Sequence, residues 1–421
     1  MNRTLICGIA LLAACAPSPA PTREKPAAAP ARPAAPRPVS RPALRPALAA
    51  PAEVGMSERL IPSLDSIIEA AIADRASPGA AIAVGRSGRI VASKGYGRTD
   101  WAQGAPAVTD STLYDLASLT KVVATTTAAM ILEEEGRLDL DRPVARYLPG
   151  FDAPDKAAIT PRMLLSHNSG MNAYHTLYRE AKGREEYLRA INARPLAHPP
   201  GTHFEYIDWN LIVLQLVVER VTGEPLDEFL RKRVFEPLGM RDTRFNPPES
   251  LRPRVAPTEV QAFRGGQVWG VVHDENAWSL GGVAGHAGLF SSARDLAVFA
   301  TMMLNGGEYR GVRILRPETI SRWTRRQNPE TSSRALGWDT PYPGSSAGRY
   351  FSARSFGHTG FTGTSIWMDH EKGIWVVLLT NRVNPTRDNP KLGPLRRAVA
   401  DAVHRSVLGA PLTDREATAR R

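Results

Sequence analysis

Residues 113–123 read LYDLASLTKVV, and they place Ser118 three residues before Lys121. A serine hydroxyl is a weak nucleophile until a neighbouring group takes its proton. Residues i and i+3 share a helix face, so in a helix the amine of Lys121 could reach the hydroxyl of Ser118. The residues that follow allow a helix down to Glu135, with Gly136 as its stop. Ser118 would then lie in the first turn, where the positive end of the helix dipole favours an alkoxide.

Two further triplets follow in order along the chain. Residues 200–210 read PGTHFEYIDWN and contain Tyr206-Ile207-Asp208, and residues 356–369 read FGHTGFTGTSIWMD and contain His358-Thr359-Gly360. With the first stretch, these triplets resemble the S-x-x-K, Y-x-N and K-T-G motifs of the serine β-lactamase and penicillin-binding-protein superfamily. The nearest likeness is to the class C β-lactamase-like serine hydrolases, which include DD-peptidases and esterases. The segments LLSHNSGM (164–171) and GHAGLFS (285–291) agree with that family, and the resemblance covers roughly residues 53–408.

The resemblance implies roles for three side chains, and each role has a simpler alternative. Ser118 is the implied nucleophile, although a serine at the start of a helix is also a common N-cap. Lys121 is implied to accept the serine's proton or to stabilise its alkoxide. It could instead be a solvent-facing lysine, but the apolar residues after it indicate a buried segment, where a lone lysine is costly. Tyr206 is the implied proton shuttle beside both residues, or otherwise a core tyrosine.

Two positions depart from the family motifs. Asp208 stands where asparagine is commoner, and an ionised aspartate accepts hydrogen bonds but donates none. It could pair with Lys121 and yet repel an anionic substrate. His358 stands at the lysine of K-T-G, and a histidine is only partly charged near neutral pH. We therefore expect a shift away from a dedicated β-lactamase, with His358 either contacting a substrate carboxylate or held by backbone groups of its loop.

The residues after His358 complete the expected substrate-binding edge. Thr359 and Gly360 would lie on an edge strand that faces the substrate, and the glycine would let a ligand approach the backbone. By the same resemblance, the backbone N–H groups of Ser118 and Phe361 would form an oxyanion hole. The expected substrate-binding residues are thus Asp208, His358, Thr359, Gly360 and Phe361.

Strand patterns occur at both ends of the chain, with helical patterns between them. Residues 57–73 carry apolar residues at helical spacing, with Ser57 as a candidate N-cap. The other predicted elements are a hairpin, two strands and a last helix, at residues 79–84 with 89–93, 364–368, 374–380 and 393–408. The family resemblance turns this pattern into an α/β fold. Its antiparallel sheet is formed by N- and C-terminal segments and flanked by helices, and a mostly helical lobe is inserted.

The N-terminus has the pattern of an export signal. Arg3 precedes an apolar run, residues 5–14, that is too short to span a bilayer. The sequence LAAC, ending at Cys15, is typical of a lipobox, in which the cysteine is acylated and becomes the new N-terminus. The alternative is an ordinary secretory signal that is cleaved after Ala14-Cys15-Ala16, which would leave Pro17 as the first residue. Cys7 would leave with the signal, so the mature chain has no pair of cysteines for a disulfide.

We divide the chain into a lipoprotein signal peptide (1–15), a disordered Pro/Ala/Arg-rich tether (16–52), a hydrolase domain (53–410) and a polar tail (411–421). Residues 1–52 hold seven Lys or Arg residues and one acidic residue, more than half of the net charge of +11. This distribution, and the lack of a recognisable nucleic-acid module, argue against nucleic-acid binding. The expected location is the bacterial cell envelope, at the periplasmic face of the outer membrane, with a lipid anchor on Cys15.

Two other patterns are weaker. His273-Asp274-Glu275 with His286 could suggest a metal site, but the metal-ligand spacings are missing, so loop hydrogen bonding explains these residues better. Residues 344–348 read GSSAG and match G-x-S-x-G, with Ser346 as nucleophile. Two prolines stand where a buried strand should precede that motif, which disfavours an α/β-hydrolase. We therefore expect no metal and no cofactor.

The motifs together predict an envelope-anchored serine hydrolase that works through an acyl-enzyme on Ser118. The expected substrates are peptides or small molecules: a cell-wall peptide of the D-Ala-D-Ala type, or a carboxylic ester. β-Lactam hydrolysis is a third choice. The rival from another class is a non-catalytic penicillin-binding protein, which is acylated without turnover.

Overall fold

The structure, a computed structural model, describes residues 47–173, 176–412 and 414. The predicted signal peptide, Cys15, most of the predicted tether and the end of the predicted polar tail lie outside the described residues. The described residues belong to one compact unit. Ala49 is buried in it, and the backbone N–H of Ala49 donates to the carbonyl of Ile90 at 2.8 Å. The last residues of the predicted tether therefore pack on the domain, which starts a few residues earlier than residue 53.

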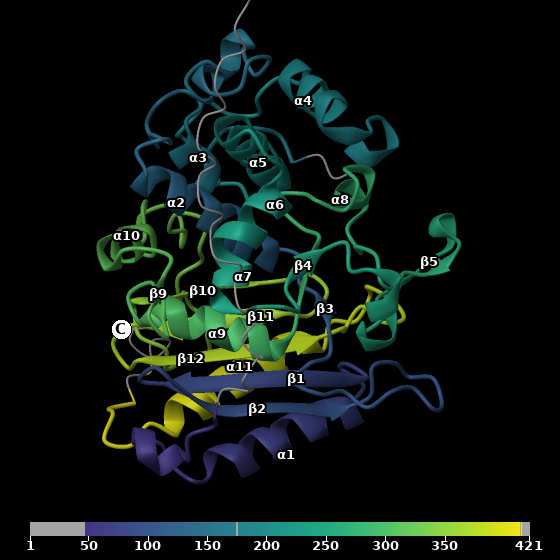
Figure 1. Cartoon of the computed structure of the whole chain (residues 1–421), viewed down its shortest axis with the longest axis vertical. Helices are drawn as coiled ribbons and strands as arrows, with labels where there is room; N and C mark the ends of the chain where they lie inside the picture. Colours follow the sequence, from purple (N-terminus) through teal and green to yellow (C-terminus); the bar gives the residue numbers. More distant parts are fainter. Residues whose placement is uncertain (1–46, 174–175, 413, 415–421) are drawn as a thin grey trace, which may run out of the picture. The chain divides into compact units, whose positions relative to one another are not determined.

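One antiparallel sheet of five strands joins the two ends of this unit. Its strand order is β10-β11-β12-β1-β2, so the central contact pairs an N-terminal strand with a C-terminal one (Figure 1). The strands are β1 (Gly79–Arg86), β2 (Arg89–Gly97), β10 (Ser355–Thr359), β11 (Ser365–Asp369) and β12 (Ile374–Thr380). The predicted sheet is confirmed, and β10, which carries His358 and Thr359, lies at its edge.

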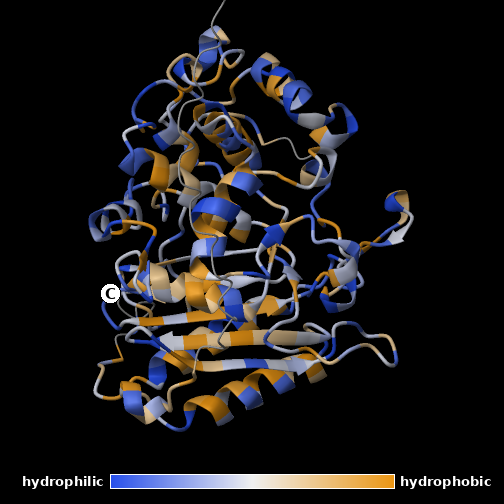
Figure 2. Cartoon of the chain, viewed as in Figure 1, coloured by the Kyte–Doolittle hydropathy of each residue, from blue (hydrophilic) through white to orange (hydrophobic). Residues whose placement is uncertain are grey.

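Both faces of the sheet are covered by helices. Helices α1 (Leu60–Ala73) and α11 (Leu392–Arg405) pack on one face, and α9 (Ala293–Leu304) packs on the other. Successive side chains of a strand point to opposite faces. Alternate residues of β1 therefore enter two different cores, which explains the nearly unbroken apolar runs of β1 and β12 (Figure 2).

The segment between β2 and α9 forms the mostly helical lobe. The helix that carries Lys121 is π-helical over η2 (Lys121–Thr126) and α-helical over α2 (Thr127–Glu134). Gly136 follows with a φ of +69°, so the predicted helix and its stop are confirmed. The other helices in this segment and just after it are α3 (Pro161–Leu165), α4 (Gly183–Ala193), α5 (Asp208–Thr222), α6 (Leu226–Leu230), α7 (Glu236–Leu238), α8 (Glu275–Ser279) and α10 (Pro317–Trp323).

Short strands and helical turns complete the structure. A three-stranded sheet has the order β3-β7-β4, and its strands are β3 (Tyr114–Asp115), β4 (Arg244–Phe245) and β7 (Leu289–Ser291). Two small hairpins are formed by β5 (Val260–Gln261) with β6 (Gly266–Gln267) and by β8 (Glu308–Tyr309) with β9 (Val312–Arg313). Two short 3-10 helices are η5 (Leu177–Arg179) and η8 (Ala262–Arg264). No helix among the described residues is both long and apolar enough to cross a bilayer.

Helix α1 begins later than the apolar spacing predicts. Its N-cap is Arg59, whose side chain makes no capping bond. Ser57 lies one turn earlier, where its hydroxyl accepts the N–H of Arg59 at 3.2 Å and its carbonyl accepts the N–H of Leu60 at 3.0 Å. Ser57 thus stabilises the turn that leads into α1 and is not its N-cap.

Candidate active site

Ser118 lies in a tight turn between β3 and η2. The preceding Ala117 has a φ of +46°, in the left-handed region that residues other than glycine seldom adopt. The carboxylate of Asp115 holds this turn, because it accepts the N–H of Ala117 at 2.8 Å. The same carboxylate accepts the N–H of His273 at 2.6 Å. Ser118 is thereby presented directly ahead of the helix that carries Lys121.

The Lys121 side chain is fully buried and directed at Ser118. Its Nζ donates to Ser118 Oγ at 2.8 Å, to the carbonyl of His286 at 3.2 Å and to Asp208 Oδ1 at 2.7 Å. These three acceptors use all three donors of an ammonium. Burial lowers the pKa of Lys121, but the acidic groups of Asp208 and Tyr206 outweigh burial and leave that pKa above its usual value. These contacts agree with an ammonium at Lys121, and the choice between its two predicted roles stays open.

The Tyr206 ring lies among the other candidate residues, just before α5. Lys121 Nζ is 5.0 Å from the ring centroid, and the guanidinium carbon of Arg334 is 4.9 Å from it. The ring centroids of His167 and His358 lie 4.6 Å and 5.9 Å from that of Tyr206. The structure thus brings together residues from the three sequence motifs, as predicted.

His167 positions the segment that carries Tyr206. Its Nδ1 lies 3.1 Å from both the N–H of Ile207 and the amide nitrogen of Asn210, so it accepts from that segment. Burial, with the nearby positive charge of Arg334, lowers the pKa of His167 well below its usual value. The ring is therefore neutral, as an acceptor must be. The sequence marked residues 164–171 as family-like but assigned no role to this histidine.

His358 is buried in β10 and lies against Arg334. Arg334 Nη1 is 3.0 Å from His358 Nε2, and His358 Nδ1 is 2.7 Å from the carbonyl of Thr359. An arginine only donates, so Nε2 accepts and Nδ1 carries the proton. Burial and the positive charge of Arg334 lower the pKa of His358 well below its usual value. Arg334, which the motifs did not reveal, is the positively charged group beside His358. The bond from Nδ1 to the carbonyl of Thr359 agrees with the alternative in which backbone groups hold His358, and its contact with a substrate carboxylate stays a prediction.

Gly360 follows β10 in a turn that packs on the nucleophile segment. Thr362 and Thr364 donate their hydroxyls to the carbonyls of Asp115 and Leu116, at 2.7 and 2.8 Å. A Cβ on Gly360 would lie 2.1 Å from Thr364 Oγ1 and 2.3 Å from the Leu116 carbonyl oxygen. Close packing of the protein on itself therefore requires this glycine, and the approach of a ligand to its backbone stays a prediction.

The expected oxyanion hole has two backbone donors available. Within residues 47–173, 176–412 and 414, the N–H groups of Ser118 and Phe361 donate no hydrogen bond. Free donors are what a developing oxyanion requires. The buried Arg396 of α11 fixes the turn that carries Phe361, because its Nη2 donates to the carbonyls of Gly360 and Thr364, both at 2.7 Å. The oxyanion hole at Ser118 and Phe361 remains a prediction, and this geometry is compatible with it.

The suspected metal-like cluster consists of hydrogen-bonded side chains. Asp208, Asp274 and His286 place one potential ligand atom each within 4.8 Å of one another. Their partners are protein groups, because Lys121 donates to Asp208 and His286 Nε2 lies 2.8 Å from Asp274 Oδ1. His273, which the sequence had grouped with Asp274 and His286, lies outside this three-residue group, and its Nε2 is 2.9 Å from Glu259 Oε2.

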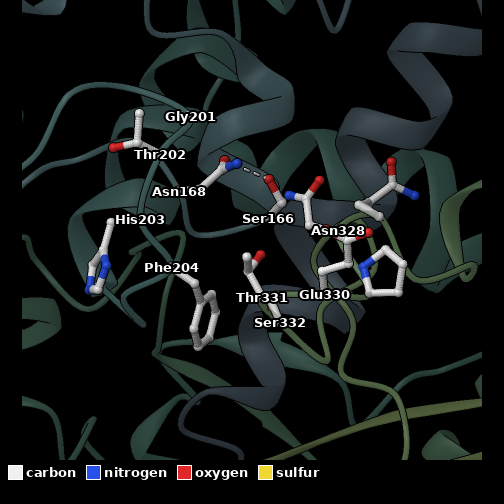
Figure 3. Close-up of a pocket in the computed structure, with 12 residues that line it drawn as sticks. Ser166, Asn168, Gly201, Thr202, His203, Phe204, Asn328, Glu330, Thr331 and Ser332 are labelled. Atoms are coloured by element: carbon white, nitrogen blue, oxygen red, sulfur yellow. Dashed lines mark hydrogen bonds between the residues drawn. The ribbon is translucent and has the colours of Figure 1, made fainter.

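A pocket of about 290 Å³ adjoins these residues in sequence (Figure 3). Ser118 does not line the pocket. Its walls include the residues on either side of His167, and also Phe204 and Ser332, which come two residues before Tyr206 and Arg334. The lining residues are Ser166, Asn168, 201–204 and 327–332. Ser346, the rival nucleophile, lies outside this region. Its hydroxyl accepts from the indole of Trp367 at 2.9 Å, and no strand–turn–helix surrounds it.

The comparison with protein families agrees with this geometry. The model of the family described as "Beta-lactamase" matches residues 64–401. The chain belongs to the β-lactamase family. A Salmonella schwarzengrund protein named "Putative D-alanyl-D-alanine carboxypeptidase" is 34% identical over 386 residues, which cover 82% of this chain and 88% of that protein.

Solved structures confirm the fold of this β-lactamase-family member. A penicillin-binding-protein homologue from Caulobacter crescentus has a TM-score of 0.69 at 23% identity, covering 83% of this chain and 98% of that one. EstCE1, described as a hydrolase with promiscuous acyltransferase activity, has a TM-score of 0.68 at 24% identity, covering 82% and 99%. With the Ser118–Lys121–Tyr206 cluster, the family identifies the chain as a serine hydrolase.

Proposed function

We propose that this serine hydrolase cleaves peptides that end in a free carboxylate, of the D-Ala-D-Ala type. The observation that carries the proposal is the guanidinium of Arg334, which lies beside the edge strand, 4.9 Å from the Tyr206 ring and 3.0 Å from His358. Its side chain is 13% exposed, and its Nε lies 3.9 Å from Asp339. A guanidinium is always charged and pairs with carboxylates through two parallel hydrogen bonds. The name of the Salmonella relative supports the same substrate class.

The proposed reaction assigns one step to each group. Ser118 Oγ attacks the carbonyl carbon of the scissile amide, and its proton passes to the Tyr206 oxygen, which acts as a phenolate beside the Lys121 ammonium. The N–H groups of Ser118 and Phe361 bind the oxyanion while the Lys121 ammonium stabilises the developing charge. As the tetrahedral intermediate collapses, the C–N bond breaks and Tyr206 returns the proton to the leaving amine. Water then attacks the ester on Ser118 and releases the acid.

The negative charge of Asp208 does not conflict with an anionic substrate, although the sequence alone suggested that it would. An isolated carboxylate there would repel an anionic peptide. In the structure, Asp208 Oδ1 is held 2.7 Å from the Lys121 ammonium, which offsets its charge. Burial raises the pKa of Asp208, but the positive charge of Lys121 outweighs burial and keeps that pKa below its usual value. Arg334 therefore remains available to the substrate carboxylate.

Matched substrates test the proposal. We would compare kcat/KM for an acyl-D-Ala-D-Ala peptide, the same peptide with a C-terminal amide, a neutral chromogenic ester and a fluorescent penicillin, following adducts by intact mass. At least tenfold preference for the free carboxylate over the amide is expected. Equal rates on both peptides with fast ester turnover would identify an esterase instead. Fast release of hydrolysed penicillin would identify a β-lactamase, and a stable adduct without turnover would identify a penicillin-binding protein.

We further propose that the enzyme is anchored in the bacterial envelope by a lipid on Cys15. The lipobox-like LAAC and the Pro/Ala/Arg-rich segment after it support this location. The replacement Cys15→Ala should release active enzyme from the membrane fraction. A mature wild-type protein that begins at Pro17 without a lipid would overturn the anchor and leave the catalytic proposal unaffected.

A further inference from the structure

His286 contacts the catalytic centre through two different groups. Its backbone carbonyl accepts from Lys121 Nζ at 3.2 Å, and its imidazole Nε2 lies 2.8 Å from Asp274 Oδ1. Burial raises the pKa of Asp274, but His286 outweighs burial and holds that pKa well below its usual range, so the carboxylate is ionised. A carboxylate can only accept, so Nε2 of His286 carries the proton. His286 therefore connects Lys121 to a second carboxylate behind Asp208.

The backbone around His286 is held firmly against the nucleophile helix and α5. Thr125 of η2 donates its hydroxyl to the carbonyl of Gly285 at 2.7 Å, and the N–H of Gly285 donates to Gln215 of α5 at 2.7 Å. A Cβ on Gly285 would lie 2.0 Å from the carbonyl oxygen of Leu211, so the segment touches the α5 backbone. The contact with Asp274 also fixes the imidazole side chain of His286, in addition to its backbone.

The cluster contains two carboxylates close together in a partly buried place, since the side chains of Asp208 and Asp274 are 24% and 27% exposed. Asp208, Asp274 and His286 have ligand atoms within 4.8 Å of one another, and His286 is 1% exposed. Like charges repel strongly where water screens them little. Without the N–H of His286, the Lys121 ammonium would face two carboxylates, and its bond to Ser118 would compete with both.

We propose that His286 and Asp274 are positioning residues of this catalytic centre, which together keep the Lys121 ammonium directed at Ser118. In this arrangement His286 donates a hydrogen bond to Asp274, so the positive charge of Lys121 pairs with the carboxylate of Asp208 alone. The inference requires Ser118 as the nucleophile but not any particular substrate. It concerns how the lysine is held, and so it applies equally to a peptidase, an esterase or a β-lactamase.

Several charged or titratable groups act on this pair from the surrounding elements. They are Asp115 of β3, Lys121 of η2, Tyr187 of α4, Asp208 of α5 and Arg264 of η8. Substitutions of the pair can alter the pH dependence of several groups together. The test therefore relies on compensation between substitutions rather than on one pH midpoint.

The test measures how fast Ser118 reacts with an aryl fluorophosphonate, followed by intact mass on the folded full chain. The replacement His286→Leu should slow this reaction at least tenfold, because Asp274 loses its imidazole donor and keeps only the N–H of Ala277. Adding Asp274→Asn should restore at least part of the rate, because the carboxylate charge is removed. His286→Leu should also cost less in an Asp208→Asn background. Asp369→Asn is the control, a buried carboxylate that bonds Ser352 and the Glu371 turn, and it should leave the rate unchanged.

Compensation separates positioning from a purely structural role. If the double variant His286→Leu/Asp274→Asn reacts more slowly than His286→Leu alone, with losses that add, the proposal is wrong. Unchanged rates in every single variant would also overturn it. If His286→Leu does not fold, the fluorophosphonate rate of Asp274→Asn is measured with and without Asp208→Asn: effects that do not add support the proposal, and effects that add reject it. Failure of the wild type to cleave any peptide would reject the proposed substrate and leave this test unaffected.

Discussion

Arg334 donates a 3.0 Å hydrogen bond to Nε2 of His358, so the positive charge at the edge of the sheet belongs to the arginine and not to the histidine. In the K-T-G motif that the sequence resembles, one lysine would provide this charge. Here a neutral histidine on β10 lies against a guanidinium contributed by the loop that follows α10. A substrate carboxylate at this edge would therefore meet a charge that does not change with pH in the working range.

Arg334→Gln should weaken the use of substrates with a carboxylate. We expect kcat/KM on the free-carboxylate peptide to fall about 10- to 100-fold, the size of a lost charge-assisted hydrogen bond of roughly 1.5–3 kcal/mol. The amide peptide and the neutral ester should change much less. Arg326→Gln is a matched control, since Arg326 bonds Thr340 and Pro341 rather than His358. Equal losses on all three substrates would remove Arg334 from carboxylate recognition.

Asp208→Asn should move the alkaline limb of the pH–rate profile to lower pH. Asp208 is the first of the acidic groups that raise the pKa of Lys121 against the effect of burial. The ammonium persists below that pKa and is lost as pH rises through it. Removing the carboxylate lowers the pKa of Lys121, so activity should decline at a lower pH. Measuring kcat/KM on a neutral ester from pH 6 to pH 11 checks this, with the exposed Glu249→Gln as control. An unmoved limb would mean that the Lys121 charge does not limit the rate.

Gly360→Ala should damage catalysis more than stability. The new Cβ would press on Thr364 and on the Leu116 carbonyl, which displaces the turn carrying the Phe361 N–H. Losing one oxyanion donor costs about 10²–10³-fold in kcat. Gly393→Ala in α11 is the control, since its Cβ would meet open space. Retention of wild-type kcat in Gly360→Ala would show that this turn does not hold the oxyanion.

Asp295→Asn should stabilise the protein above neutral pH. Burial, reinforced by Asp242, raises the pKa of Asp295 from 3.8 to about 7. Between these values the folded state binds more protons than the unfolded state, so the free energy of unfolding falls as pH rises from about 4 to 7. Asparagine avoids this loss and keeps an oxygen for the N–H of Asp242 and the hydroxyl of Thr243. Urea unfolding should show a gain of up to about 4 kcal/mol at pH 8 and none at pH 4. An equal change at both pH values would contradict the ionisation argument.

The sequence predicted the architecture because its signals are local and strongly periodic. The apolar runs of β1 and β12 and the spacing in α1 and α11 can each be read in a short window. The order of the three motifs predicted the residues that meet at Ser118, because the resemblance supplied the tertiary arrangement. The start of α1 was less accurate, since the turn at Ser57 satisfies the same residue preferences as a helix cap.

The remaining features depend on contacts between distant segments. Arg334 comes from a loop 24 residues before His358, and no local pattern marks it. The role of His167 requires the fold that brings it to Ile207, and the need for Gly360 comes from the carbonyl of Leu116. The choice between the two alternatives for His358 depends on distant contacts as well. Its pKa depends on burial and on Arg334, which are properties of the folded chain.

Intact mass after reaction with an acylating substrate tests the central claim, that Ser118 is the nucleophile. The wild type and Ser346→Ala should both gain one acyl group, located by peptide mapping on the segment with Ser118. Ser118→Ala should gain none and should hydrolyse neither peptide nor ester, while keeping its unfolding transition. An adduct that persists in Ser118→Ala and disappears in Ser346→Ala would contradict the account.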